Sequence, residues 1–256
     1  MKMEKLISKQ GYEIPYIFEG SGDEDLLVII SHGFGSSKES TTATTVAEKL
    51  KNGGIASVRY DFPAHGESPA EGKDFRIENC LNDLQSVEEM VRESFPEKTI
   101  GYFSSSFGAF INLLYLSSRK PTGKMSFLRC SAVDMPGIVD RWMEDEDLLQ
   151  EMKEKGYVVA DEGYVKPLHV YREFWDDLKK IDLFRDFRKP EGMALRMIHG
   201  TADETAPFAD AAAFAEKFGI TLIPVEGADH SFTVNNAMDI VRAKALEFYK
   251  ESGKNE

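Results

Sequence analysis

Short apolar runs alternate with amphipathic segments along most of the chain. Residues 26–30 form an unbroken apolar run, which is the pattern of a strand covered on both faces. Similar strand-like runs occupy residues 55–60, 98–103, 125–133, 193–198 and 221–225. Helices are expected over residues 40–51, 77–95, 107–116, 208–218 and 237–250. This alternation predicts an α/β fold, with a mostly parallel central sheet and helices on both of its faces.

Two parts of the chain depart from the alternation. Residues 4–18 carry two short strand-like runs separated by Gln10-Gly11, which predicts an antiparallel hairpin at the sheet edge. Residues 136–188 form an acidic insert rich in aromatic residues. The sequence has no internal repeat or interdomain linker, so we expect one domain over residues 1–256 with an inserted subregion at 136–188.

Composition excludes several classes of partner. The net charge of −13 and the pI near 5.0 argue against binding to nucleic acid or to an anionic membrane surface. Near its start the chain has an acidic residue, Glu4, where a secretory signal would continue its apolar core, and no later stretch is long and apolar enough to span a membrane. We therefore expect a cytoplasmic protein. Cys80 and Cys130 lie in apolar runs, which favours buried free thiols over a disulfide.

A motif that could place a nucleophile joins one strand to one helix. It reads Ser104-Ser105-Ser106-Phe107-Gly108, with a strand-like run before it and a helical one after it. A sharp strand-to-helix turn exposes one side chain above the sheet, and the helix N-terminus offers unpaired N–H groups to an oxyanion. Without partners the motif could equally be a serine-rich turn, because a serine hydroxyl needs a base and an acid to act as a nucleophile.

Candidate partners follow two later strands, at the sheet edge where open α/β sheets place their sites. Asp203 comes after residues 193–198, in a His199-Gly200-x-x-Asp203 loop, and His230 comes after residues 221–225. These residues would supply the acid and the base for Ser106. Three other acids compete for the role of Asp203. Asp134 also follows a strand-like run, and Glu204 and Asp229 stand next to Asp203 and His230 in the sequence.

The three loops resemble those of the α/β-hydrolase family, and the chain order serine, aspartate, histidine is the order of that family. Ser104 departs from the family's G-x-S-x-G pattern, since glycine usually stands there. The resemblance implies that the backbone N–H groups of Phe34, in the His32-Gly33-Phe34 loop, and of Phe107 form the oxyanion hole. It implies structural roles for His32 and for His65, which lies in a second loop over residues 61–68.

Within the family, Gly-Thr-Ala-Asp followed by Glu-Gly-Ala-Asp-His resembles bacterial feruloyl and cinnamoyl esterases and related carboxylesterases. This implies a serine esterase for small ester substrates with short acyl, aryl or hydroxycinnamoyl groups, working through an acyl-enzyme. The alternatives are an acylaminoacyl-peptidase-like enzyme, a thioester hydrolase and, last, a non-catalytic binding protein.

The resemblance also makes the insert a cap over the active site. Its aromatic residues Trp142, Tyr164 and Trp175 either contact the substrate or form the core of the cap. The insert could cover a pocket, contact a second copy in a homodimer, or both. No metal-binding or nucleotide-binding motif is present, so no cofactor is expected.

Overall fold

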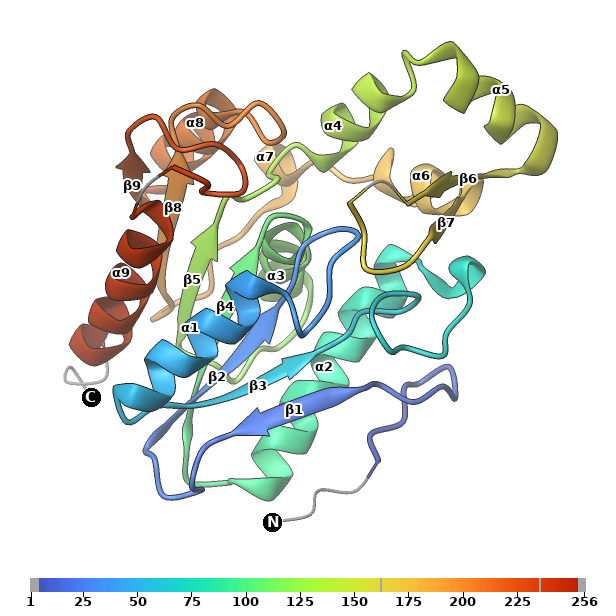
Figure 1. Cartoon of the computed structure of the whole chain (residues 1–256). Helices are drawn as coiled ribbons and strands as arrows, with labels where there is room; N and C mark the ends of the chain where they lie inside the picture. Colours follow the sequence, from blue (N-terminus) through green and yellow to red (C-terminus); the bar gives the residue numbers. More distant parts are fainter. Residues whose placement is uncertain (1–4, 162, 235, 253–256) are drawn as a thin grey trace.

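The computed structural model describes residues 5–161, 163–234 and 236–252 and contains a seven-stranded sheet (Figure 1). The strands, in their order across the sheet, are β1 (Tyr16–Glu19), β3 (Ala56–Tyr60), β2 (Leu26–Ser31), β4 (Thr99–Ser105), β5 (Met125–Arg129), β8 (Ala194–Gly200) and β9 (Thr221–Val225). Only β1 runs antiparallel to its neighbour, and the other pairs of this sheet are parallel. The predicted mostly parallel sheet is confirmed.

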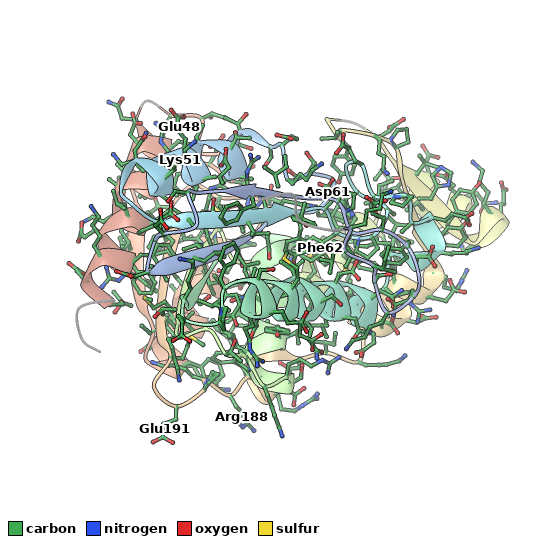
Figure 2. The ribbon with its side chains drawn as sticks, turned by 90° about the horizontal axis from the view of Figure 1, so that it is seen from below. Glu48, Lys51, Asp61, Phe62, Arg188 and Glu191 are labelled. Atoms are coloured by element: carbon green, nitrogen blue, oxygen red, sulfur yellow. The ribbon has the colours of Figure 1, made fainter. Side chains whose placement is uncertain are left out.

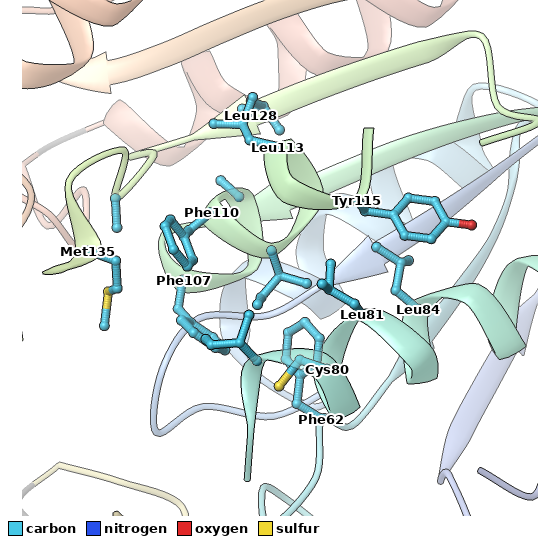
Figure 3. Packing of buried hydrophobic residues seen from close by; sticks show 14 of the residues in the cluster. Phe62, Cys80, Leu81, Leu84, Phe107, Phe110, Leu113, Tyr115, Leu128 and Met135 are labelled. Carbon is cyan, nitrogen blue, oxygen red and sulfur yellow. The ribbon is translucent and has the colours of Figure 1, made fainter. Parts of the chain in front are cut away.

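Helices cover both faces of this sheet, because successive side chains of a strand point to opposite faces. In β2, Leu27 and Ile29 belong to the apolar cluster on the face of the sheet that α2 (Ile77–Ser94), α3 (Phe107–Ser118) and α8 (Phe208–Phe218) cover. Val28 and Ile30 pack on the other face with α1 (Thr41–Asn52) and α9 (Ala237–Ser252). Figure 3 shows the apolar side chains gathered between α2 and α3.

Many charged side chains lie on the outside of these layers. Seen from below, Glu48 and Lys51 project outward from α1, and Arg188 and Glu191 project from the opposite side of the molecule (Figure 2). Phe62, in contrast, lies in the interior and is fully buried. None of the helices in the described ranges is long and apolar enough to cross a membrane.

The predicted N-terminal hairpin is present in the described residues in a reduced form. The chain forms a single antiparallel bridge between Ile7 and Glu13, and the ordered edge strand is β1, which pairs with β3. Pro15 divides the second predicted run and has no N–H to donate, so a continuous ladder cannot pass through it. Residues 1–4, which carried part of the localisation argument, lie outside the described residues.

The insert of residues 136–188, called the cap segment below, lies beside the end of the sheet to which the parallel strands point (Figure 1). Its elements are α4 (Met135–Trp142), α5 (Glu146–Lys155), β6 (Tyr157–Ala160), β7 (Leu168–Tyr171), α6 (Arg172–Leu178) and α7 (Leu183–Asp186). The strands β6 and β7 form an antiparallel pair that the sequence did not predict. An ion pair of 2.7 Å between Arg76 and Asp177 joins the cap segment to α2.

Both cysteines are free and buried, as predicted. The Cys80 thiol lies on the inner face of α2, near a buried carboxyl group on the same helix. This carboxyl group is Asp83, which is fully buried and accepts a hydrogen bond of 2.9 Å from the Tyr12 hydroxyl. Its second oxygen has no hydrogen-bond partner in the described part of the chain. Burial raises the pKa of Asp83 to about 7.

We expect Asp83 to make the free energy of unfolding depend on pH. A carboxyl group whose folded pKa is raised stabilises the protein fully at low pH, and this contribution is lost as pH rises from about 4 to about 7. Asp83→Asn should therefore unfold like wild type near pH 4 and be more stable by about 2–4 kcal/mol near pH 8. Urea titrations at both pH values measure the difference, and a difference that stays constant with pH would contradict the argument.

Candidate active site

Ser106 sits at the sharp turn between β4 and α3. The strand ends at Ser105, the helix begins at Phe107, and Ser106 between them has φ 54° and ψ −117°. A positive φ is strained for a residue other than glycine, at a cost of about 1–3 kcal/mol. The turn is held because the Ser106 N–H donates to the Arg129 carbonyl at 2.9 Å and its own carbonyl accepts from Ala109 at 2.9 Å.

The turn also requires a residue without a side chain at position 108. A Cβ added at Gly108 would lie 2.4 Å from the His32 carbonyl oxygen and 2.8 Å from that of Ser31. Ser104, which replaces the first glycine of the family pattern, is fully buried, so its small side chain fits at that position. The departure from the pattern therefore leaves the turn intact.

Gly108→Ala should destabilise the protein, because its methyl group would meet backbone atoms of the loop after β2, which cannot move aside as a side chain can. We expect the free energy of unfolding to fall by about 2–4 kcal/mol, measured by urea denaturation. Gly33→Ala is the matched control, since its nearest contact, with Ser106, is an ordinary 3.4 Å. Equal losses in the two variants would contradict this account of the turn.

Ser106, His230 and Asp203 form one chain of hydrogen bonds. The His230 Nε2 atom lies 2.9 Å from the Ser106 hydroxyl oxygen, and its Nδ1 atom lies 2.8 Å from the Asp203 carboxylate. The two loops after β8 and β9 bring the side chains of Asp203 and His230 to the strand-to-helix turn at Ser106, called the elbow below. The structure therefore places together the three residues that the sequence proposed as nucleophile, base and acid.

The surroundings of Asp203 keep it ionised. Burial raises its pKa, but hydrogen bonds from His199 and His230 outweigh burial and hold the pKa well below its usual range. Its other oxygen accepts from the backbone N–H groups of Thr205 and Ala206, at 3.0 and 2.9 Å. An ionised acceptor fixes the proton of His230 on Nδ1, so Nε2 is free to accept the Ser106 proton.

The competing acids have other roles. Asp134 caps α4 by accepting a hydrogen bond from the Gly137 N–H at 3.1 Å. Asp229 accepts from the backbone N–H and the hydroxyl of Thr233, both at 2.7 Å. The side chain of Glu204 is exposed. Asp203 is thus the acid that the structure places against His230.

Two backbone N–H groups flank Ser106 without a partner. They belong to Phe34 and Phe107, and in the described ranges neither donates a hydrogen bond. Gly33 brings the first of them close, because a Cβ built on it would be 3.4 Å from that of Ser106. These are the two donors that the resemblance implied, and together they can stabilise negative charge on an oxygen bound next to Ser106.

The two histidines near this loop are held in neutral, structural positions. His32 donates from Nδ1 to the Gly33 carbonyl at 2.7 Å and accepts on Nε2 from the Phe62 N–H at 3.1 Å. Burial lowers the pKa of His32 to about 4 and that of His65 to about 3. Both side chains shape the loops on which the site rests.

A cavity of about 400 Å³ opens at Ser106. Its lining is polar and includes serine and threonine side chains from the start of α1 together with the catalytic loops. The lining residues are Ile30, Ser31, His32, Gly33, Phe34, Ser36, Ser40, Thr41, Thr42, Ala43, Phe103, Ser105, Ser106, Arg129, His230 and Ser231.

The three aromatic residues proposed to bind substrate lie together but line a different cavity. Trp142, Tyr164 and Trp175 surround about 360 Å³ inside the cap segment, and Ser106 does not border this space. Phe34 lines both cavities, and its ring packs edge-on against Trp142 at 5.4 Å. The three residues also pack with the apolar core, which is one of the two roles that the sequence left open. Contact with the substrate stays a prediction.

Sequence reasoning missed two residues that touch the hydrogen-bond chain. His199 lies 3.1 Å from Asp203, and the Arg129 guanidinium donates to Ser105 and to the His230 carbonyl, each at 2.7 Å. Cys130, His199 and Asp203 present possible metal ligands within 4.8 Å of one another. A metal ion there would take from His230 its acidic partner, so this group suits the acid role better than a metal role.

Comparisons with known proteins agree with the fold. No curated protein sequence matches the chain. Among solved structures, Est1E from Butyrivibrio proteoclasticus with ferulic acid bound superposes with a TM-score of 0.81 at 19% identity, covering 98% of this chain and 99% of that one. Mouse alpha/beta hydrolase domain-containing protein 10 gives 0.76 at 18% identity, covering 98% and 99%. An esterase from Pyrococcus furiosus, Pf2001, gives 0.69 at 18% identity, covering 97% and 91%.

These structural similarities establish the fold, and a comparison with models of sequence families establishes the family. The model of the family described as serine aminopeptidase, S33, matches residues 22–158, which is more than half of the chain. This range contains the loop after β2 and the elbow with Ser106. The match agrees with the resemblance noted in the sequence. The chain is therefore a hydrolase with the α/β-hydrolase fold and belongs to the serine aminopeptidase S33 family.

Proposed function

We propose that the protein hydrolyses carboxylic esters through an acyl-enzyme on Ser106. The observation that carries the proposal is the hydrogen-bond chain from Ser106 through His230 to Asp203, beside two N–H groups that have no partner among the described residues. A hydroxyl with an oriented base and a place for an oxyanion is suited to acyl transfer. The neighbours that are esterases, and the one solved with ferulic acid, support ester substrates with short acyl or hydroxycinnamoyl groups.

Each step of the proposed reaction uses a named group of this chain. His230 takes the Ser106 proton on Nε2 as the oxygen attacks the ester carbonyl. The carbonyl oxygen, now negative, is stabilised by the N–H groups of Phe34 and Phe107. His230 then protonates the leaving alcohol, and a water molecule, activated by the same histidine, releases the acid and restores Ser106.

The family description raises aminopeptidase activity as the second candidate. A carboxylate attracts an ammonium group strongly, so recognition of a free peptide N-terminus favours an acidic side chain in the site. No aspartate or glutamate is among the described residues that line the Ser106 cavity, and the cap cavity contains one exposed acid, Asp161. This charge pattern favours a neutral or anionic ester over a free peptide N-terminus.

A substrate panel tests the proposal. The panel contains p-nitrophenyl esters of increasing acyl length, methyl ferulate, an acyl thioester, a blocked peptide and an aminoacyl p-nitroanilide. We expect turnover of the oxygen esters, lost in Ser106→Ala. Faster turnover of the anilide than of every ester would favour the aminopeptidase. Activity that survives in Ser106→Ala would show that another residue is the nucleophile.

A further inference from the structure

The cavity at Ser106 differs in charge from the rest of the molecule. The chain has 44 acidic and 31 basic residues, so its surface is dominated by negative charge. The described residues that line this cavity nevertheless include no acidic side chain and one permanent cation, Arg129. A cavity lined by a cation and, among the described residues, by no acidic side chain favours the entry of an anionic group.

Arg129 is buried without an acidic partner. It is 4% exposed, and among the residues that the structure describes its partners are neutral: the Ser105 hydroxyl, the His230 carbonyl and the Phe232 ring, which lies 4.7 Å from the guanidinium carbon. Its Nε atom has no hydrogen-bond partner there. Taking a cation out of water is costly unless an anion compensates it.

Arg59, which is equally buried, shows the usual solution. It is also 4% exposed, and it forms ion pairs with Glu19 at 3.5 Å and Glu39 at 3.3 Å. Among the described residues, Arg129 has no such ion pair, and it lies at the Ser106 cavity, where a bound substrate could supply the missing carboxylate. Each terminal nitrogen of Arg129 donates one hydrogen bond, to Ser105 or to the His230 carbonyl, and has a second N–H group. A planar guanidinium with two such groups is well suited to bind a carboxylate.

A second feature of the same cavity also favours the binding of an anion. Ser40, Thr41 and Thr42 line it, and they form the N-terminal end of the helix α1, which has no acidic residue in its first turn. The N-terminal end of a helix carries partial positive charge and exposed N–H groups, and it attracts anions. The hydroxyl groups of these residues add further hydrogen-bond donors.

We propose that Arg129 binds a carboxylate on one half of the substrate, so that the preferred substrates are short esters with a negative charge. The inference rests on the proposed function and specifies its substrate class. The anionic half would occupy the polar cavity of about 400 Å³ beside Ser106. Phe34 separates this space from the aromatic cap cavity, which is suited to an apolar half.

Two matched pairs of esters test the proposal, one for each half of the substrate. The first pair is the mono-p-nitrophenyl ester of glutaric acid beside p-nitrophenyl valerate, and the second is the butyrate ester of glycolate beside ethyl butyrate. In at least one pair, the carboxylate member should have a kcat/KM about 10- to 100-fold higher in wild type. Arg129→Gln should abolish this preference, and Arg129→Lys should keep part of it.

The ratio within each pair separates binding of the carboxylate from positioning of His230, which Arg129 also contacts. Loss of positioning slows both members equally, whereas loss of the anion site slows only the charged one. Ser105→Ala is the matched control, because it removes one contact of Arg129 and keeps the charge, so the ratio should stay near the wild-type value. Equal slowing of both members in Arg129→Gln, or no preference in wild type, would overturn the proposal.

A binding measurement keeps this inference separate from the proposed function. If no ester of either pair is hydrolysed, the esterase proposal fails, and calorimetry with succinate on wild type and Arg129→Gln still tests the anion site. Binding to wild type alone would support the site. Equal binding to the two proteins, or none to either, would overturn it.

Discussion

Replacing Ser106 with alanine is expected to lower kcat for ester hydrolysis by roughly 10⁶-fold. The reason is that no other hydroxyl can take its place at the elbow. Ser104 is fully buried, and the Ser105 hydroxyl is bonded to Arg129 at 2.7 Å. Stopped-flow and long-time assays with a p-nitrophenyl ester measure the loss of activity. Labelling by a fluorophosphonate, which phosphonylates a reactive serine, tests whether the nucleophile is lost.

The same reasoning predicts that the losses are not additive. Because Ser106 and His230 act as one unit at 2.9 Å, the double variant Ser106→Ala/His230→Ala should be no slower than Ser106→Ala alone. Ser106→Gly gives a structural control, since glycine accepts φ 54° without strain and should raise the free energy of unfolding by about 1 kcal/mol relative to Ser106→Ala. A double variant that is a further 100-fold slower than Ser106→Ala would contradict this account, because it would mean that the two residues act independently.

The sequence predicted the parts of the site that lie on short loops after strands. Ser106, Asp203 and His230 each follow an apolar run, and parallel strands bring their carboxyl ends to one edge of the sheet, so their meeting follows from the topology. The sharp turn at Ser106 could be predicted because only small residues fit around it, as the contacts of Gly108 show.

Arg129 and His199 could not be predicted in this way. Both lie within strands, β5 and β8. His199 opens the motif that pointed to Asp203, but that motif gave His199 no role of its own, and no motif marks Arg129. Their importance comes from side-chain partners that are distant in the sequence, such as the His230 carbonyl for Arg129, 101 residues away. An arginine in an apolar run is a signal of a buried charge, but its partner depends on which loop the fold places over it.

The sequence predicted that the cap segment interrupts the α/β alternation, but it did not predict the secondary structure inside the segment. Its acidic and aromatic composition marked the limits of the insert, but the pairing of Tyr157–Ala160 with Leu168–Tyr171 has no strong signal in such short strands. Aromatic residues also fit a core and a cavity equally well. Tertiary contacts, such as that of Phe34 with Trp142 at 5.4 Å, decide between these uses.

Asp203→Asn is expected to lower kcat by about 10⁴-fold. One carboxylate oxygen accepts two backbone N–H groups, and the other faces His230 and His199. The single oxygen of asparagine will take the first position, so its NH₂ group will face His230 Nδ1. That nitrogen must then accept, which places the proton on Nε2, where it prevents acceptance of the Ser106 proton. Steady-state kinetics measure the loss, and Glu204→Gln, at the exposed neighbouring acid, should leave kcat unchanged.

The same substitution should also destabilise the protein, and in a way that depends on pH. His199 donates from Nε2 to the Ala206 carbonyl at 2.8 Å, so this nitrogen cannot also accept from an asparagine NH₂ group, and the clash should cost about 1–3 kcal/mol in the free energy of unfolding. A carboxyl group whose folded pKa is lowered stabilises the protein above its unfolded pKa, and the contribution is lost as pH falls through the folded value. The gap between wild type and Asp203→Asn should therefore be constant from about pH 5 to pH 7 and shrink only below about pH 4. A gap that already closes near pH 6 would mean that the protein does not hold Asp203 as a strongly stabilised anion, and the tautomer argument for His230 would fall with it.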